Sequence, residues 1–325
     1  MWRTQALLGL LSLLAVGLSA QAADVSYFEG IPELQRASGD SEAIDFGLSV
    51  GTEDAVVTGT GDFVELSLAN GGTVSVESNT VFRIDEISEN GQPPVPVLRT
   101  TVGSVRVALG DRIRGTAEPR IATASAAAGV RGTEFLVFAG QDGSSLFVVE
   151  QGLVVVSGEN GNVELGPEQA VEVNTDGRLG ERFQVRRGSI NFQDWNRGRL
   201  QRFEEEPVAI MREARQRMSQ LIREIRNLRQ SYGRLSREID ELRIEARRLA
   251  DEGMRDEAAQ LFAAEIEPRQ LEASYRLITL RYTVNTAINL RTFVIAPLNA
   301  RGQALLIRDA ERLRDFSGEY RQIVR

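Results

Sequence analysis

The side chains of this chain that could take part in chemistry are carboxylates, hydroxyls and arginines. Its 325 residues include no histidine and no cysteine, and all 38 basic residues are arginine. Catalysis by Ser-His or Cys-His pairs, by a lysine Schiff base or by a P-loop lysine is therefore excluded. Zinc and iron–sulfur sites with Cys or His ligands are excluded for the same reason. We expect no cofactor and no metal.

Paired carboxylates are the catalytic arrangement that this composition still allows. Glu134, Glu150 and Glu164 are candidates for the acid and base of a glycoside hydrolase, although such pairs arise by chance in an acidic region. Residues 59–63 loosely resemble a calcium-binding glycine–aspartate repeat, but they occur once and such sites need stacked copies. The sequence therefore favours a binding or scaffold protein over an enzyme.

Residues 1–22 have the pattern of an export signal. Arg3 precedes an apolar run over residues 6–18, and Ala20 and Ala22 form an A-x-A cleavage site. We predict cleavage after Ala22. The apolar run is shorter than the roughly 20 residues that span a bilayer. We therefore expect an exported protein, periplasmic or extracellular, with no transmembrane segment after signal cleavage.

Charge and composition divide the rest of the chain in two. Residues 24–183 hold 25 acidic residues and 10 arginines, whereas residues 184–325 hold 21 acidic residues and 27 arginines. Glycine and β-branched residues are frequent in the first part, and leucine, arginine, glutamate and alanine in the second. We predict an all-β domain over residues 23–183, a junction over 184–206 and a helical coiled-coil region over 207–325.

The predicted β domain contains many short alternating runs, such as residues 63–68, 73–76 and 145–149. Turn sequences such as Asn70-Gly71-Gly72 and Glu159-Asn160-Gly161 separate them. Short strands with a turn about every 8–12 residues are typical of a sandwich, a barrel or a β-solenoid. The pattern is consistent with each of these three.

Four segments of this domain, taken together and in this order, form a motif. They are Gly103-Ser104-Val105-Arg106-Val107, residues 121–135 ending in Arg131-Gly132-Thr133-Glu134-Phe135, residues 149–156 around Gly152, and residues 163–173. This set resembles the FecR family, most strongly over residues 60–180. The resemblance implies a β-solenoid-like or sandwich-like domain outside the cytoplasm that senses or binds another protein.

The best-known members of that family are single-span regulators of a sigma factor, with a cytoplasmic helical segment before the membrane span. This sequence has an export signal in place of both, so we expect the domain in a wholly exported protein. Gly132 and Gly152 are expected at the starts of strands, where glycine allows a positive φ or a close approach of another backbone. Arg131 and Glu134 flank this turn and are expected to stabilise it rather than to bind a ligand.

The helical region begins with Glu204-Glu205-Glu206-Pro207, a typical helix start. Six consecutive heptads follow, and they indicate a coiled coil. The predicted seam contains Met218, Leu221, Ile225, Leu228, Tyr232, Leu235, Ile239 and Leu242. We expect Pro268 to end this helix and Pro297 and Gly302 to interrupt a second arm over residues 269–325. The two arms favour an antiparallel hairpin, although the same stripe could pair two chains into a homo-oligomer.

These features predict a non-catalytic exported protein. Its β domain would bind a partner protein or an envelope or cell-wall component, and its helices would act as a spacer or oligomerisation element. The alternatives are a structural envelope rod and a carboxylate-based glycan hydrolase. A flat apolar or strand-edge surface would favour binding, whereas a polar cleft with two carboxyls within roughly 5–10 Å would favour hydrolysis. Glutamates interleave with the helical arginines, so we expect solvated faces and no nucleic-acid partner.

Overall fold

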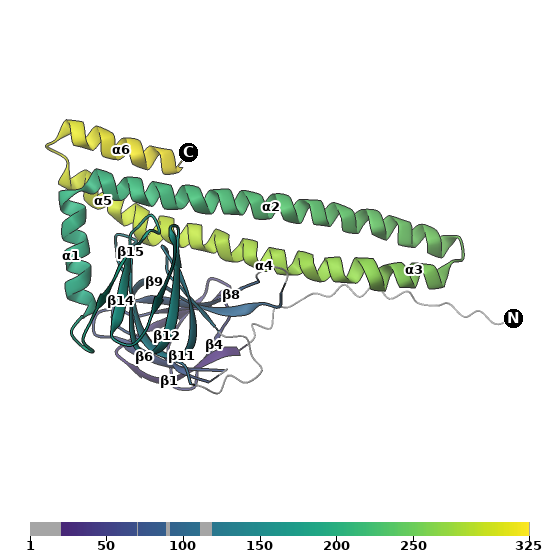
Figure 1. The fold of residues 1–325 in the computed structure, drawn as a ribbon, viewed down its shortest axis with the longest axis horizontal. Coiled ribbons are helices and arrows are strands. Elements are labelled where there is room, and N and C mark those ends of the chain that lie inside the picture. The colour runs from purple at the N-terminus through teal and green to yellow at the C-terminus, as the bar shows by residue number, and fades with distance from the viewer. Residues whose placement is uncertain (1–20, 70, 89–91, 111–118, 325) are drawn as a thin grey trace.

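A computed structural model describes residues 21–69, 71–88, 92–110 and 119–324. Strands occupy the N-terminal part up to Gln184, and helices occupy the chain from Phe192 onward (Figure 1). The prediction of a mostly β domain followed by a long helical region is confirmed. Most of the predicted signal peptide lies outside the described residues, and Gln21 and Ala22 begin the first strand.

The described part of the β domain contains fifteen strands in one connected sheet. They are β1 (Gln21–Glu29), β2 (Glu33–Gln35), β3 (Ser41–Ala43), β4 (Ser49–Gly51), β5 (Ala55–Val57), β6 (Phe63–Leu68), β7 (Thr73–Val76), β8 (Val81–Ile87), β9 (Val95–Ala108), β10 (Arg120–Ala122), β11 (Ala127–Ala139), β12 (Ser145–Gly158), β13 (Gly161–Leu165), β14 (Gln169–Val173) and β15 (Leu179–Gln184). Among these described strands, the pairings are antiparallel except for β9 with β10. The antiparallel ladders do not confirm the solenoid-like alternative.

Alternation along the strands builds the core of this domain. Val64, Leu66 and Leu68 of β6 are buried, and so are Val74 and Val76 of β7, while the residues between them are more exposed. Removing each such side chain from water stabilises the fold by about 1.5–3 kcal/mol. The alternating pattern therefore determines which face of each strand turns inward.

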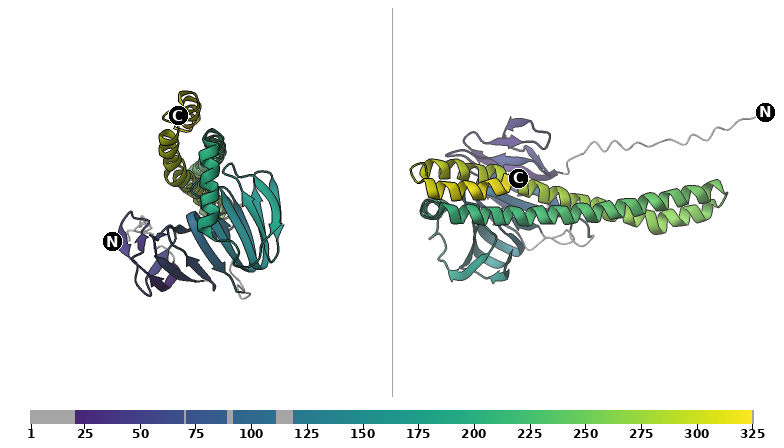
Figure 2. Two further views of the ribbon diagram at one scale, coloured as in Figure 1. Left: turned by 90° about the vertical axis from the view of Figure 1, so that its left-hand side faces the viewer. Right: turned by 90° about the horizontal axis from the view of Figure 1, so that it is seen from above.

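Six α-helices and two π-helical segments are present in the described residues of the C-terminal part. They are α1 (Phe192–Glu205), α2 (Pro207–Asp251), α3 (Arg255–Leu261), η1 (Phe262–Ile266), α4 (Glu267–Asn289), η2 (Leu290–Ile295), α5 (Ala296–Leu305) and α6 (Ala310–Val324). Helix α1 runs along one edge of the β domain, and α2 then forms a long hairpin with α3–α5 (Figure 1). Seen along the hairpin, the helices lie over the sheet, between its N-terminal and C-terminal strands (Figure 2).

The turn of the hairpin lies at residues 252–254, so the expectation that Pro268 ends the first helix is wrong. Gly253 has a φ of +88°, the left-handed conformation that glycine adopts after a helix. Pro268 and Pro297 instead lie in the first turns of α4 and α5, directly after η1 and η2. A proline ring clashes with the carbonyl four residues earlier, and a π-helical turn changes that spacing. The arm therefore continues through both prolines.

Gly302 does not interrupt the second arm either, because it lies inside α5. A Cβ atom at this position would lie 2.2 Å from Cζ of Phe316 in α6. The glycine therefore allows α6 to pack closely against α5.

The predicted seam lies along the face of α2 that packs within the chain. Met218, Leu221 and Ile225 form an apolar cluster with residues of α4 and η2, and Leu235, Ile239 and Leu242 form a second cluster with Ile266 and Ala273. Leu228 and Tyr232 lie between these clusters and are half-buried. In this structure the stripe serves an intramolecular hairpin.

Replacing Leu235 by Asp is expected to destabilise the outer half of the hairpin. Leu235 is only 7% exposed, and a buried charge without a partner adds to the loss of about 2–5 kcal/mol from the missing side chain. Hydrogen exchange should show reduced amide protection near Leu235 and unchanged protection in the β domain. Ile244→Asp is the control, because Ile244 lies on the same helix and is 67% exposed. Equal protection in both variants would contradict the packed seam.

Candidate functional site

The residues of the FecR-like signature form a β-bulge in the middle of the hairpin of β11 and β12. The register of this pair shifts between Arg131 and Glu134. Gly132 has a φ of +53° and Gly152 a φ of +82°, so both adopt the expected positive φ. They lie inside long strands, however, and the expectation that they start strands is wrong. The side chain of Arg131 lies outside what the structure describes.

The bulge is the point at which the hairpin changes its neighbours. Before it, β11 pairs with β10, and after it β11 pairs with β9. The first half of β12 pairs with β14, and the second half pairs with β13. A bulge bends and twists a strand locally. The signature therefore forms a corner at which the sheet turns from one set of strands to the next.

Close backbone contacts explain why glycine is needed at this corner. A Cβ atom on Gly152 would lie 2.4 Å from the carbonyl oxygen of Gly132. Gly103 lies away from this corner, opposite Ala139, and also needs to be glycine. Its φ is +102°, and a Cβ atom there would lie 2.2 Å from Oγ1 of Thr80. Thr133 is buried within the corner, and Phe135 is fully buried in the core. These signature residues thus have packing roles.

Replacing Gly152 by Ala is expected to destabilise the β domain by at least about 2 kcal/mol. The side chain would meet the backbone of Gly132, and the positive φ adds strain. Gly129→Ala is the matched control, because Gly129 lies on β11, has no positive φ and would place its Cβ in open space. Urea unfolding followed by circular dichroism would measure both variants. Equal midpoints would disprove the steric argument.

Two of the three candidate carboxylates meet beside this corner in an ion cluster. Oε1 of Glu134 lies 3.2 Å from Nη1 of Arg106 and 3.0 Å from Nη2 of Arg187. Glu150 contacts Arg106, and its Oε2 lies 3.2 Å from Nη2 of Arg187. The third candidate, Glu164, is exposed on β13 and accepts a hydrogen bond from Arg182 through its backbone carbonyl.

This ion cluster favours a structural role for the pair of carboxylates. Both carboxylates are bound by guanidinium groups, whereas the acid of a glycosidase must face the glycosidic oxygen of its substrate. The cluster also ties β9, β11 and β12 to the segment before α1, from which Arg187 comes. Sequence reasoning missed Arg187, because nothing in its local sequence distinguishes it from other surface arginines.

A cleft of about 880 Å³ adjoins this ion cluster, between the sheet and α1. Its polar wall on the sheet comes from the β7–β8 turn and from β9, and its opposite wall comes from α1 and the residues just before it. The apolar lining residues are Leu136, Phe138, Ile190, Phe192 and Leu200. The polar lining residues are Glu77, Ser78, Asn79, Ser104, Arg106, Gln141, Asn191, Gln193, Asp194, Asn196 and Arg197. A concave surface of this size with both kinds of side chain is typical of a binding site.

The charged groups of the cleft differ in how they are paired. Arg106 belongs to the ion cluster, and Nη1 of Arg197 lies 2.9 Å from Oδ1 of Asp194. Hydrogen bonding from Asn191 and the charge of Arg197 lower the pKa of Asp194. Glu77 has no ion-pair partner among the described residues. Desolvation raises the pKa of Glu77, and the charge of Arg106 opposes this rise.

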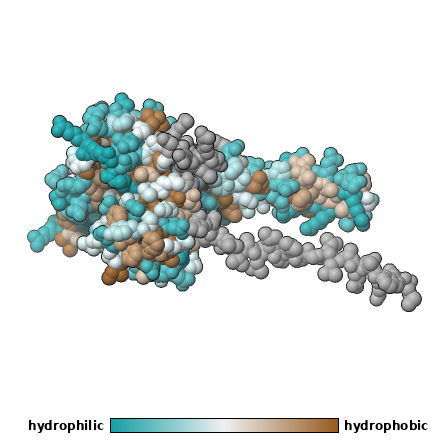
Figure 3. All heavy atoms as spheres, turned by 90° about the horizontal axis from the view of Figure 1, so that it is seen from below, coloured by the Kyte–Doolittle hydropathy of each residue, from teal (hydrophilic) through white to brown (hydrophobic). Residues whose placement is uncertain are grey.

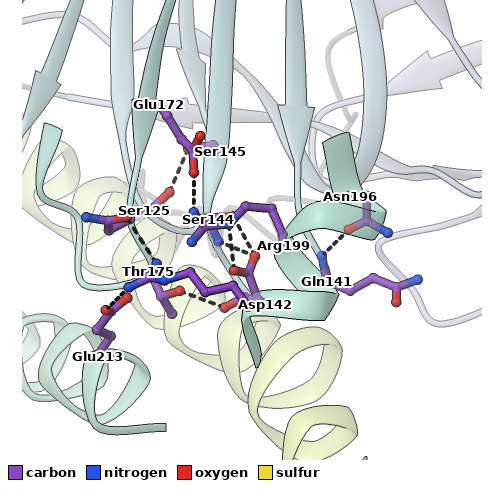
Figure 4. Close-up of polar contacts among 12 residues, drawn as sticks. Ser125, Gln141, Asp142, Ser144, Ser145, Glu172, Thr175, Asn196, Arg199 and Glu213 are labelled. Carbon is purple, nitrogen blue, oxygen red and sulfur yellow. Dashed lines mark hydrogen bonds and ion pairs between the residues drawn. The ribbon is translucent and has the colours of Figure 1, made fainter. Parts of the chain in front are cut away.

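The wall formed by α1 is held in place by a buried ion pair (Figure 4). Nε of Arg199 lies 2.9 Å from Oδ2 of Asp142, and neither side chain is more than 9% exposed. Asp142 belongs to the β11–β12 turn, whose Ser144 amide donates to the same carboxylate at 3.1 Å. Glu172 of β14 also contacts Arg199. Removing one member of such a pair typically costs about 3–5 kcal/mol.

A neighbouring hydrogen bond strengthens this attachment of α1. Oδ1 of Asn196 accepts from the amide of Gln141 at 3.1 Å (Figure 4). In the sequence, residues 141–143 indicate only a turn, and Arg199 follows Asp142 by 57 residues. Local patterns could not reveal that these groups meet.

Asp62, in the segment that loosely resembles a calcium-binding repeat, has structural partners. The carboxylate of Asp62 accepts hydrogen bonds from the amides of Gly59 and Ile31, so it ties two turns together. No set of three or more acidic residues in the described part of the chain is arranged to hold a metal ion.

Comparison with known proteins gives one family match. Residues 54–155 match the family described as FecR protein. Two crystal structures described as "a putative anti-sigma factor from Parabacteroides distasonis ATCC 8503" are similar at 21% and 20% identity, each with a TM-score of 0.34. Each match covers 40% of this chain, which spans 59% of the length of those chains.

No curated protein matches this chain. The family match includes the bulge at Gly132 and Gly152, the carboxylates of the ion cluster, and the β7–β8 turn that lines the cleft. It excludes α1 and the helical hairpin. This chain therefore contains a FecR domain, at residues 54–155.

Proposed function

We propose that this is a non-catalytic exported protein that binds a partner protein or an envelope component through the cleft between its FecR domain and α1. The observation that carries this proposal is the cleft itself, where an apolar floor lies beside polar groups of the FecR domain. The ion cluster and the pair of Asp142 with Arg199 hold its walls in place. A preformed concave surface of this kind binds with little loss of conformational entropy.

The helical hairpin serves as a spacer in this proposal. It extends well past the β domain, and its surface there mixes hydrophilic and weakly apolar residues (Figure 3). The seam residues of α2 pack within the chain, so we favour a spacer over an oligomerisation element. The binding surface proposed here is concave, whereas the sequence suggested a flat one. The hydrolase alternative still loses support, because Glu134 and Glu150 are both bound to arginines and neither lines the cleft.

Export rests on the pattern of residues 1–22. None of the helices in the described residues is long and apolar enough to cross a membrane. Cleavage after Ala22 leaves β1 beginning at Ala23, which is buried and pairs with Leu68 of β6. The shortened strand therefore keeps its place in the sheet.

The first amino acid of the mature protein is expected to be Ala23. Mass spectrometry of the protein purified from an envelope or culture-supernatant fraction would identify it. An intact Met1 on protein found in the cytoplasm would contradict export. A variant with Ala20 and Ala22 both changed to bulky residues should accumulate uncleaved, because signal cleavage needs small residues at these positions.

Blocking the cleft is expected to abolish capture of the partner. Gln141 and Gln193 are exposed lining residues, and their side chains make no hydrogen bonds within the described part of the chain. The double variant Gln141→Trp with Gln193→Trp should therefore fold normally while filling the cleft. The immobilised mature protein would be incubated with envelope extract, and the bound material identified by mass spectrometry.

Gln201→Trp is the matched control for this experiment. Gln201 is an exposed residue of α1 that does not line the cleft. The Gln201→Trp variant should capture the same component as the original protein. If the double variant binds that component equally well, the cleft is not the binding surface.

A further inference from the structure

The polar groups that remain unpaired in the cleft are mostly amides. The side chains of Gln141 and Gln193 make no hydrogen bonds within the described residues. Asn196 uses its Oδ1 for the amide of Gln141, and Asn79 uses its Oδ1 for Thr60, so the side-chain NH₂ group of each remains available. A side-chain amide carries donors and an acceptor close together, which matches the alternating N–H and C=O groups of a peptide backbone.

The apolar groups of the cleft offer a second kind of contact. Phe138 and Phe192 lie edge to face, with ring centroids 5.7 Å apart, and Leu136 and Ile190 lie beside them in the lining. Such a floor favours burial of apolar side chains, because their removal from water is favourable. An extended peptide presents side chains on alternate faces, so one face could meet the floor while the backbone meets the amides.

The charges of the cleft select among ligands. The two arginines of the lining are neutralised by carboxylates of this chain, since Arg106 contacts Glu134 and Glu150, and Arg197 contacts Asp194. Glu77 is the lining carboxylate that has no ion-pair partner among the described residues. An acidic ligand would therefore meet an unpaired negative charge, whereas a cation would neutralise it.

From the unpaired amides, the apolar floor and the unpartnered Glu77, we propose that the cleft binds an extended peptide segment in which apolar side chains flank a lysine or arginine. This proposal rests on the proposed function and specifies its ligand as a segment of a partner protein. A neutral glycan would satisfy the amides but would leave Glu77 without a partner. The charge arrangement therefore favours the basic peptide over both a glycan and an acidic peptide.

The test begins with the full mature chain and a displayed library of peptides about seven residues long, close to the usual length of a strand. The selected peptides should share apolar residues around a basic one. A synthetic consensus peptide would then be titrated by fluorescence anisotropy against the original protein. Replacing its basic residue by glutamine should weaken binding about fivefold, as expected for a partly exposed charge pair.

A double-mutant cycle then connects this charge preference to Glu77. With Glu77→Gln, the basic peptide and its glutamine version should bind with nearly equal affinity. Glu181→Gln is the matched control, because Glu181 is exposed on β15, does not line the cleft, and should keep the fivefold difference. An unchanged difference in Glu77→Gln would overturn the proposal. Selection of acidic peptides, or binding of glycan fragments where no peptide binds, would also overturn it.

Failure of the ligand assignment can be distinguished from failure of the proposed function. If the cleft-blocking double variant loses its envelope partner but the library yields no basic peptide, the ligand assignment is wrong and the proposed function stands. If that variant keeps its partner, the cleft is not the binding surface and both proposals fail.

Discussion

The buried ion pair between Arg199 and Asp142 is the contact on which the arrangement of the cleft depends. It joins the first helix of the C-terminal region to a turn of the FecR domain, at a site almost closed to solvent. Taking two charges out of water is costly, and good geometry with additional hydrogen bonds is needed to offset that cost. Asp142 receives such bonds from Ser144, and Arg199 also contacts Glu172. The helix is therefore held in one specific orientation.

A second buried arginine anchors the long hairpin. Arg99 of β9 is 1% exposed, and its Nε lies 2.6 Å from Oδ2 of Asp85. Its guanidinium also contacts the hydroxyl of Thr286 and lies 4.3 Å from the centroid of the Tyr282 ring, both on α4. The hairpin is thus attached to the sheet by a polar contact as well as by apolar packing. These contacts hold α4 in one direction relative to the FecR domain.

The FecR signature contributes to the site indirectly. Its glycines allow the bulge at which β11 and β12 turn, and Glu134 in the same motif binds arginines from two other segments. One of these arginines, Arg106, also lines the cleft. The motif therefore shapes a corner of the sheet. The groups that we propose to contact a ligand lie around this corner.

Local sequence patterns are sufficient to predict the division into a mostly β part and a helical part, and the position of the apolar stripe on α2. These features depend on local periodicity, which repeats every two residues in a strand and every 3.6 in a helix. The sequence also indicated a positive φ or a close backbone approach at Gly132 and Gly152, and both residues have a positive φ. The prediction that they start strands is wrong, because a bulge lets one strand continue through a glycine that locally resembles a strand boundary.

The position of the hairpin turn and the meeting of distant groups depend instead on how the elements pack in three dimensions. Pro268 carries a strong local signal for a helix end, but the preceding π-helical turn lets the helix continue, and Gly253 forms the turn instead. The contacts of Arg199 with Asp142 and of Arg187 with Glu134 join residues 57 and 53 positions apart. Ion pairs of this kind depend on how separate elements pack, and packing direction is not encoded in local spacing. The cleft, which needs walls from both parts of the chain, is for that reason a property of the folded molecule alone.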